Sequence, residues 1–561
     1  MKEIKVFLKS LILLTFCHLA NAQEDSGGRI SGNLEANSNF FMKDTRIGAA
    51  NTPQYEHELF GADAWMNLNY SNWGFDFGLR FDIYNNSYLP DPRNSYTDEG
   101  IGRWYIKKKI QKLEISAGYL YDQVGSGIIF RAYEQRPLFI DNALKGVRLT
   151  YDLNEDWKIK AFTGRQKNAF DVYQSVIKGG SIEGYIAGKE GSKWSLAPGL
   201  GVVGRTHSKD AIDDLYSTIG SYTPQDTVSI TYNTYAVSLY NTLTFGKFGW
   251  YAEAAYKTNE TFFDTFAEKH NWDGGVSEGK FVRRPGTVFY SSLSYGTKGF
   301  GINVEGKRTE NFTFRANPFV QLNRGMINFL PPMTRINSYR LTARYAAATQ
   351  ELGEMAFQAD INYNPSRKLN FNLNFSNITD LNDVQLYREV YFTAKYKYKR
   401  KWELLAGIQM QQYNQEIYEI KPGVPLLETI TPFIDFTYKI DRKKAIRFEG
   451  QYMSVGDDNY KGGKQDYGNW VFGLAEYTIA PKWTFTVSDM FNINPGVNSP
   501  ENTNGEKESI HYPRFDIYFT HKANRFSLSY VKQVEGIVCS GGICRLEPAF
   551  SGVKFTVNSS F

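Results

Sequence analysis

The stretch VRLTYDLNEDWKIKA, residues 147–161, shows the pattern that decides the fold. Val147, Leu149 and Tyr151 alternate with polar residues, and after the polar turn 154–156 the segment 157–161 alternates in the same way. Successive side chains of a strand point to opposite faces, so each segment has one apolar and one polar face. Segments 392–398 and 402–410 repeat this arrangement on either side of a basic turn. We therefore expect strands whose two faces lie in different environments.

Such segments repeat from residue 28 to the C-terminus. Further pairs turn sharply at residues 71–73, 109–112, 190–193, 245–248, 296–299, 365–368, 441–444, 480–482 and 522–524. Long polar connections join the pairs, around residues 86–100, 165–177, 207–229, 258–284, 310–350, 414–427, 456–466, 493–508 and 536–545. A transmembrane barrel separates short periplasmic turns from long extracellular loops, whereas a soluble sandwich has no reason to do so. The sequence thus predicts an all-β fold, a large antiparallel up-and-down transmembrane β-barrel of about 24 strands, within a range of about 20 to 26.

The composition excludes several other classes of protein. The 561 residues are 42% hydrophobic and 22% charged, which argues against a disordered chain. A mean hydropathy of -0.44, without any apolar run of about 18 residues beyond the N-terminus, argues against a bundle of membrane-spanning helices. Lys and Arg number 64 against 59 Asp and Glu, so no nucleic-acid partner is expected.

The first 22 residues have the order of a secretory signal peptide. Basic residues precede an apolar stretch, and Ala20-Asn21-Ala22 forms a small-x-small cleavage site. A membrane anchor would need roughly 20 apolar residues, and this stretch is shorter. We expect removal of residues 1–22, which leaves 23–561 as the outer-membrane barrel. The remaining Cys539 and Cys544 are expected to form a disulfide, because an exported protein meets an oxidising environment.

The C-terminal strand resembles the assembly signal of Gram-negative outer-membrane barrels. Val553, Phe555, Val557 and Phe561 alternate with polar residues and end on the final aromatic residue. The resemblance implies location in the cell outer membrane, contact with its lipid, and insertion by the barrel-assembly machinery. Segments 125–134, 141–147 and 539–545 are similar to a family of uncharacterised bacterial outer-membrane barrels, which implies a location and no activity. No plug domain precedes the first expected strand near Arg29, which weakens a resemblance to TonB-dependent receptors.

Charged residues of the strands are expected on the lumenal face, because a Lys that faces lipid at mid-depth costs about 2 to 4 kcal/mol. This prediction covers Lys158, Lys160, Glu253, Glu305, Lys307, Lys395 and Lys397. Aromatic residues near strand ends suit the interfacial girdles, namely Trp65, Tyr70, Trp73, Trp157, Trp250, Trp402 and Trp483. About 24 strands enclose more space than their side chains fill, so the lumen must hold water, infolded loops or a separate plug.

Two long connections are candidates for functional sites. Segment 121–144 places opposed charges among apolar residues, and its lumen or constriction candidates are Arg131, Glu134, Arg136 and Asp141. It could fold into the lumen and select solutes, or it could be an ordinary solvated outer loop. Segment 310–337 is rich in apolar residues that need a cover, and its binding candidates are Phe319, Phe329 and Arg335. It could cap or partly plug the pore, bind a partner at the surface, or pack on neighbouring loops.

Signatures of enzymes and of metal sites are weak. The motif at 275–279 matches G-x-S-x-G but lacks the apolar strand that must precede such a nucleophile. The histidines show no metal-binding spacing, and the acidic segment 457–466 lacks the ligand order of a calcium loop. We therefore expect no catalytic residue, no metal and no cofactor.

Three functions follow from this pattern. The leading hypothesis is a passive or gated pore that passes a small or medium-sized solute. The second is a loop-occluded barrel that acts as a scaffold or binding partner in an outer-membrane or surface complex. The third, an outer-membrane hydrolase, would need a Ser/His or acidic cluster at one rim. Whether the lumen is open decides among them.

Overall fold

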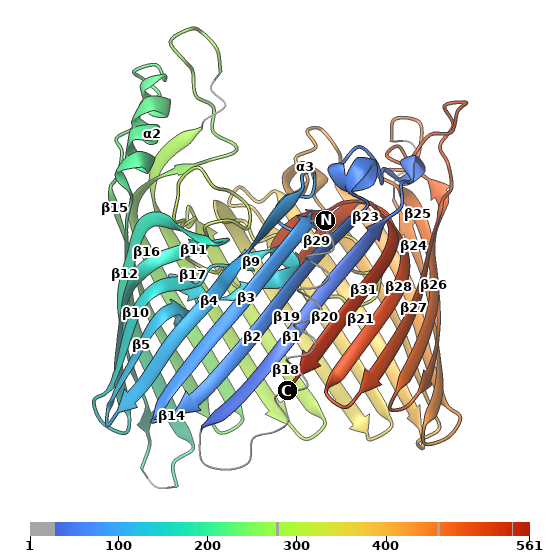
Figure 1. Ribbon diagram of the computed structural model, residues 1–561, viewed down its shortest axis with the longest axis horizontal. Helices are drawn as coiled ribbons and strands as arrows, with labels where there is room; N and C mark the ends of the chain where they lie inside the picture. The colour runs from blue at the N-terminus through green and yellow to red at the C-terminus, as the bar shows by residue number, and fades with distance from the viewer. Residues whose placement is uncertain (1–27, 190, 277–279, 457–459, 541) are drawn as a thin grey trace, which may run out of the picture.

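The computed structural model describes residues 28–561 apart from 190, 277–279, 457–459 and 541, and it shows a closed antiparallel β-barrel (Figure 1). The predicted signal peptide 1–22, and the parts of two motifs at 277–279 and 457–459, lie outside the described residues. Strands pair with their neighbours in chain order, and β31 (Phe550–Ser560) pairs with β1 (Arg29–Phe41) to close the cylinder. The strands β12 (Asp171–Gly184) and β13 (Ile186–Ala187) share the neighbour β14, so the wall has the predicted 24 strands.

The other wall strands are β2 (Phe60–Asn72), β3 (Phe75–Ser87), β4 (Tyr96–Ile110), β5 (Leu113–Leu120), β10 (Leu144–Asp152), β11 (Trp157–Asn168), β14 (Trp194–Thr206), β15 (Asn233–Phe245), β16 (Phe248–Phe263), β17 (Phe281–Thr297), β18 (Phe300–Glu310), β19 (Gly353–Ser366), β20 (Leu369–Thr379), β21 (Gln385–Tyr398), β22 (Trp402–Tyr413), β23 (Leu427–Lys439), β24 (Lys444–Val455), β25 (Gly468–Ile479), β26 (Trp483–Pro495), β27 (His511–His521) and β28 (Asn524–Gln533). Outside the wall lie η1 (Thr45–Ile47), η2 (Gln54–Glu58), β6 (Asp122–Val124), β7 (Phe130–Ala132), β8 (Glu134–Gln135), η3 (Arg136–Leu138), β9 (Ile140–Asp141), α2 (Lys209–Gly220), α3 (Gln415–Tyr418), β29 (Gly536–Ser540) and β30 (Ile543–Glu547).

Short turns gather at one end of the barrel, the turn end, and most long connections gather at the other, the loop end (Figure 1). The connection that carries α2 and the connection between β16 and β17 rise furthest above the loop end. No helix among the described residues is long and apolar enough to cross a membrane.

The predicted long connection at 165–177 is wrong. Strands β11 and β12 continue through it and meet at a two-residue turn, where Ala169 has a φ of 53°. A register shift between Arg165 and Lys167 lets Gln166 and Lys167 both contact residues inside the barrel. The lumenal face of a strand can carry polar side chains, so the polar residues of this stretch did not distinguish a strand from a loop. The loop-end connection 42–59, in contrast, was not predicted.

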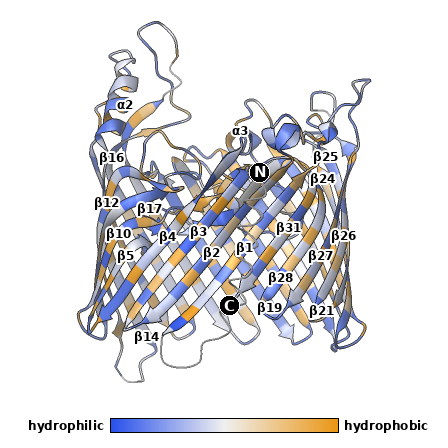
Figure 2. Ribbon diagram, in the orientation of Figure 1, coloured by the Kyte–Doolittle hydropathy of each residue, from blue (hydrophilic) through white to orange (hydrophobic). Residues whose placement is uncertain are grey.

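Alternate residues of the wall separate an apolar outer face from a polar lumenal face, as Figure 2 shows along the strands. Lys395 and Lys397 of β21 pair with Glu403 of β22 at 2.8 and 3.1 Å on the lumenal side. Lys160, Glu253 and Lys307 contact plug residues inside the barrel. Lys158 and Glu305 lie two residues from Lys160 and Lys307 on the same strands, and so on the same lumenal face, which confirms the prediction for that set. Trp65 does not join an interfacial girdle, because it faces the lumen, is buried, and donates its indole N–H to Tyr84 at 3.3 Å.

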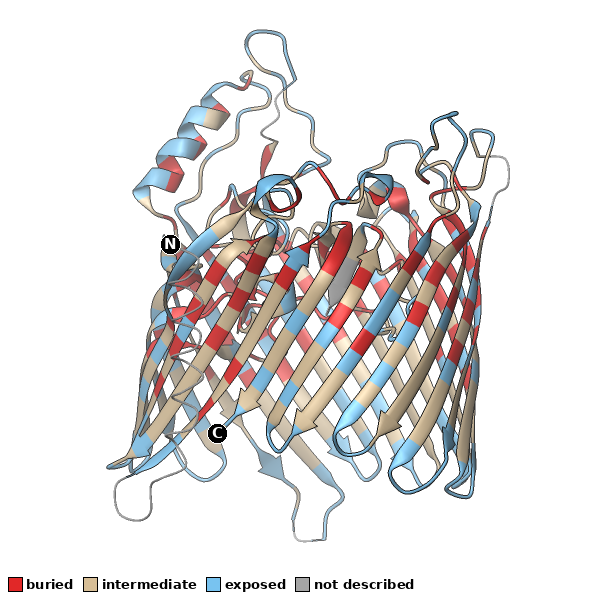
Figure 3. Ribbon diagram, turned by 45° about the vertical axis from the view of Figure 1, so that its right-hand side comes forward, coloured by how far each residue is buried: buried red, intermediate tan, exposed pale blue. Residues whose placement is uncertain are grey.

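The main hydrophobic core lies inside the cylinder, in the half nearer the loop end (Figure 3). It forms because two connections fold inward, residues 121–143 and 311–352, which together we call the plug. Plug residues of this core include Val124, Ile128, Ile129, Phe312, Phe314 and Ile327, and wall residues include Phe162, Ile177, Val203, Ala236 and Ala255. Toward the turn end the lumenal side chains line water-accessible cavities instead.

Candidate functional site

The two plug segments fill much of the space that a barrel of this size would otherwise leave to water. The first contains the short antiparallel pairs β6–β7 and β8–β9, and the second is mostly irregular. They bind each other through backbone hydrogen bonds, from Arg131 N to Ile327 O at 2.8 Å and from Phe329 N to Gly127 O at 2.9 Å. The plug is therefore one packed unit built from two insertions.

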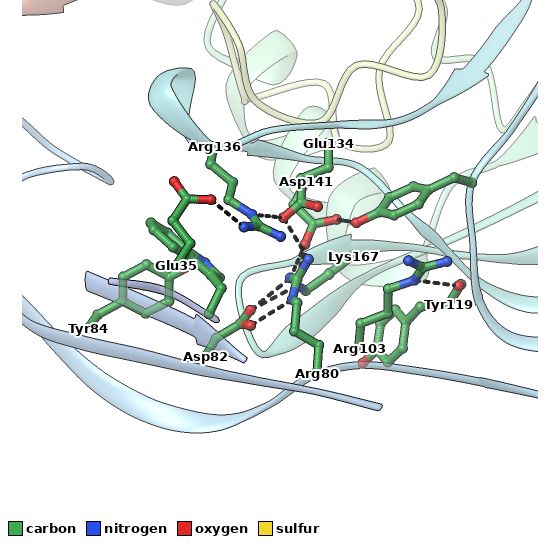
Figure 4. Close-up of polar contacts among 12 residues, drawn as sticks. Glu35, Arg80, Asp82, Tyr84, Arg103, Tyr119, Glu134, Arg136, Asp141 and Lys167 are labelled. Atoms are coloured by element: carbon green, nitrogen blue, oxygen red, sulfur yellow. Dashed lines mark hydrogen bonds and ion pairs between the residues drawn. The ribbon is translucent and has the colours of Figure 1, made fainter. Parts of the chain in front are cut away.

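Arg80 of β3 ties the first plug segment to the wall (Figure 4). Its side chain is 2% exposed, and its Nε and Nη2 donate to Asp82 at 2.6 and 2.8 Å. Nη1 donates to Glu134, and Nη2 also donates to Asp141, each at 2.6 Å. The planar guanidinium suits this role because it presents several donors in fixed directions. One wall cation thus bridges a wall carboxylate and two plug carboxylates.

Two more cations complete this cluster. Lys167 of β11 lies 2.5 Å from Asp141, and Arg136 of η3 donates to Glu134 at 2.9 Å and to Glu35 of β1 at 2.6 Å. Burial raises the pKa of Asp141, but the positive charges of Lys167 and Arg80 outweigh burial and hold this pKa below its ordinary value. Asp141 is therefore ionised at neutral pH, and charge holds this plug segment to the wall.

A second set of buried charges holds segment 311–352. Lys257 of β16 and Arg205 of β14 both pair with Glu260, and all three side chains are at most 3% exposed. Two cations share one carboxylate, so further acceptors come from the Thr234 hydroxyl of β15 and from carbonyl oxygens of the plug. Arg205 donates to the carbonyl of residue 315 at 2.8 Å, and Lys257 donates to that of residue 313. Without the plug these cations would lose hydrogen-bond acceptors, and a buried cation that lacks acceptors is destabilising.

Two further anchors lie along the same segment. Lys307 of β18 pairs with Glu354 of β19 at 2.6 Å, and its ammonium also donates to the carbonyl of Pro331. Tyr345 donates its hydroxyl to Asp466, in the connection 456–467, at 2.6 Å. Burial raises the pKa of Asp466, but the nearby positive charges of Arg344 and Lys421 and the hydrogen bonds outweigh it and leave the pKa lowered.

Three of the four predicted constriction residues come together, since Glu134, Arg136 and Asp141 belong to the cluster around Arg80. The alternative of an ordinary solvated outer loop for 121–144 is wrong. Arg131 lies apart from the cluster, with its guanidinium carbon 4.1 Å from the centroid of the Phe329 ring. That contact joins the two plug segments, and any role of these residues in selecting solutes stays a prediction.

The other two binding candidates in 310–337, Arg335 and Phe319, have different surroundings. Arg335 contacts the wall, where it donates to Asn372 at 2.6 Å and lies 3.9 Å from the centroid of the Tyr391 ring. Phe319 is 39% exposed and packs edge-on against Phe281 at 5.1 Å. The segment therefore plugs the lumen, while Phe319 leaves part of its ring in solvent.

Comparison with known proteins places the chain in a family. Residues 1–561 match a family described as a family of unknown function, DUF6029. The protein belongs to this family. No curated protein matches it in sequence.

Several solved structures are similar in fold. The P pilus usher (PapC) translocation pore has a TM-score of 0.41 and 10% identity, covering 95% of this chain and 99% of that chain. The siderophore receptor PirA from Pseudomonas aeruginosa has a TM-score of 0.39 and 6% identity, covering 96% and 81%. The ferric-catecholate import receptor Fiu from E. coli K12 has a TM-score of 0.38 and 10% identity, covering 96% and 82%.

The wall partners of the plug were missed by sequence reasoning. Arg80 and Asp82 stand two residues apart in the middle of a strand, on the face opposite Leu79 and Phe81. Two opposite charges in the middle of a strand, on the face that alternation assigns to the lumen, are the signal that could have identified them. Among the wall residues that hold segment 311–352, Lys307 was predicted as a lumenal charge, while Arg205, Lys257, Glu260 and Glu354 carry the same signal and were missed.

The described residues contain no group of three or more His, Cys, Asp or Glu arranged to hold a metal ion. Cys544 is disulfide-bonded, and the register of the β29–β30 hairpin sets Cys539 opposite it. The side chain of Cys539 is outside the part of the chain that the structure describes, so the predicted pairing stays a prediction.

Proposed function

We propose that the protein is a loop-gated pore of the cell outer membrane that passes a small or medium-sized solute. The outer face supports a place in lipid, because large apolar side chains such as Leu239, Phe289 and Phe515 are 64%, 53% and 52% exposed on the wall. Such surface around a whole barrel needs an apolar cover. Insertion by the barrel-assembly machinery, with Phe561 as part of the signal, belongs to the same proposal.

The observation that supports a gated pore is that each plug segment joins two paired wall strands but contributes no strand to the wall. Glu310 lies opposite Gly353 and Leu120 lies opposite Leu144 in continuous antiparallel registers. The strands that flank each plug segment therefore keep their hydrogen bonds whether or not the segment occupies the lumen. Displacing the plug would open a path between the loop end and the cavities at the turn end.

The same anchors favour a second function, a closed barrel that acts as a scaffold in an outer-membrane or surface complex. Several buried ion pairs hold the plug, and breaking a buried pair typically costs about 3 to 5 kcal/mol. A plug that never leaves would make the loop end a binding platform. Conductance separates the two functions.

The test removes both plug segments from the refolded barrel. Residues 122–142 and 312–351 are each replaced by a short Gly/Ser turn, which the pairing of Leu120 with Leu144 and of Glu310 with Gly353 allows. We expect the variant to conduct ions steadily in planar bilayers, whereas the unaltered chain conducts rarely.

A matched control shortens another connection by the same design. Residues 208–231, which carry α2, are replaced by a similar turn between Thr206 and Asn233, which are also paired. This control should behave like the unaltered chain. A plug-deleted barrel that folds, shown by heat-modifiable migration, and never conducts would overturn the pore and favour the scaffold.

A further inference from the structure

The lumen contains a cavity with an excess of positive charge, which runs along the wall from the turn end toward the loop end. Its volume is about 490 Å³, and it lies between Arg340 of the plug and the wall strands β25 to β28. Four cations and two carboxylates line it. Arg514 pairs with Asp516 at 2.8 Å, and Lys532 pairs with Asp44 at 2.6 Å, so both of these cations already have partners.

The other two cations form no ion pair with a carboxylate of the described residues, although Glu547 lies close enough to act electrostatically on Arg340. Arg340 is exposed to the cavity and makes no ion pair or hydrogen bond to any residue that the structure describes. Arg525 contacts only the ring of Tyr518, at 4.8 Å, among the described residues. The remaining carboxylate of the lining is Glu476. Enclosure in the barrel and the positive charges of Arg344 and Arg514 lower the pKa of Arg340 to about 10.

The turn-end rim of the neighbouring strands β19 to β24 has the same sign of charge. The turns 367–368, 399–401 and 440–443 hold seven Lys or Arg residues and one carboxylate, Asp441. A second cavity of about 640 Å³ lies at this rim and is lined by Arg367 and Lys368 together with Lys395 and Lys397. Charges of one sign along a low-dielectric opening draw in solutes of the opposite sign.

The wall of the first cavity also has an apolar part. Leu474, Met490 and Val531 line it beside the ring of Tyr512. A site that combines free guanidinium groups with apolar and aromatic surface suits a ligand with an anionic group and an apolar body.

We propose that the cavity at Arg340 binds an organic anion, a phosphate or carboxylate attached to an apolar group, that enters from the turn end. This inference rests on the proposed function in one respect only, which is that the ligand would be the solute that the pore passes. Binding itself does not require conduction. Arg340 and Arg525 would donate to the anion, and the apolar wall would contact the rest of the ligand.

The test measures binding of phenyl phosphate and of inorganic phosphate to the refolded full-length protein by titration calorimetry in a neutral detergent. We expect phenyl phosphate to bind more tightly than inorganic phosphate. Arg340→Gln should weaken binding of phenyl phosphate roughly 10- to 100-fold, the range for loss of a charge-assisted hydrogen bond. Arg283→Gln removes the same charge from an exposed position at the loop end of β17, away from the cavity and the rim, and should leave the affinity nearly unchanged.

Absence of phenyl phosphate binding, or equal affinity of Arg340→Gln and the unaltered chain, would overturn the site. Equal affinity for the two phosphates would overturn the apolar part of the proposal. Tight binding of phenethylamine, a cation of similar size, would overturn the charge assignment. Because the titration uses the closed chain, a barrel that binds phenyl phosphate but never conducts would refute the pore and leave the site standing.

Discussion

The ion cluster around Arg80 is expected to set how often the first plug segment leaves the lumen, and Asp141→Asn tests this. The Asp141 carboxylate accepts from Arg80 at 2.6 Å and from Lys167 at 2.5 Å, and both donors belong to the wall. Its third donor, Tyr121 at 2.8 Å, is part of the plug and would move with it. The substitution keeps the shape of the side chain and removes its charge, so it weakens contacts that exist only in the closed state.

The size of the effect follows from those two contacts. A hydrogen bond to a charged group contributes about 1.5 to 3 kcal/mol, and the amide oxygen of Asn can keep one weaker bond of about 1 kcal/mol. The net loss is then about 2 to 5 kcal/mol, which raises the equilibrium constant for opening about 30- to 4000-fold. Relief of repulsion among the carboxylates acts in the opposite direction and is smaller, since those groups do not contact one another directly.

Hydrogen exchange by mass spectrometry measures the opening directly. The amides of Arg131 and Phe329, which join the two plug segments, should exchange faster by that factor, and channel open probability should rise in parallel. Asp152→Asn is the control, because its ion pair with Lys109 is exposed at the turn end and contributes about 1 kcal/mol at most. Wall amides should exchange alike in both variants. A folded Asp141→Asn barrel whose plug exchanges at the unaltered rate would refute the assignment of Arg80 and Lys167 as anchors.

Three further predictions concern the plug and the wall. Because the pKa of Asp466 is lowered in the folded chain, its stabilising contribution is complete at neutral pH and is lost as pH falls below the ordinary value of 3.8. Hydrogen exchange of the plug amides, measured after acid pulses, should therefore increase only below that pH. Gly201→Leu should displace the plug and raise conductance, since even a Cβ there would lie 2.2 Å from Val124. Gly473→Leu is the control, because a Cβ at Gly473 would have no atom within 4 Å, and it should leave conductance unchanged. Equal conductance of the two variants would contradict this packing. Leu239→Lys should lower the free energy of unfolding of the barrel, measured with urea in vesicles, by about 2 to 4 kcal/mol. Thr242→Lys, on the lumenal face, should leave it unchanged. Similar losses in the two variants would argue against a lipid-facing Leu239.

The barrel itself could be predicted because each of its determinants is local. The alternation along 147–151 and 157–161 fixes two strands and their faces, and the turn between them fixes their antiparallel pairing. The same local rule misassigned 165–177, because Gln166 and Lys167 are polar for a reason that lies elsewhere in the chain. Their partners are Met326 and Asp141, and only the folded structure brings those residues near.

The plug could be predicted only as one alternative, for a related reason. The charges of Glu134, Arg136 and Asp141 are visible in the sequence, but an infolded loop and a solvated loop can have the same composition. What distinguishes them is the set of acceptors and donors offered by distant strands, such as Arg80 on β3. Sequence separation hides those pairs, so neither composition nor spacing could decide between the two readings.

The charges of the wall also bear on what an open lumen would pass. When the first plug segment leaves, Glu134 and Asp141 leave with Arg136, so the site around Arg80 loses one more negative charge than positive charge. When the second leaves, Arg205 and Lys257 remain on the wall with a single carboxylate and lose the carbonyl oxygens of the plug. The second segment, however, carries five Arg residues and one carboxylate, Glu351, so its departure also takes four net positive charges out of the lumen. Movement of the first segment alone should therefore favour anions over cations, whereas departure of both segments should remove that preference. The ratio of anion to cation permeability, measured from reversal potentials in a salt gradient, would show which segment moves.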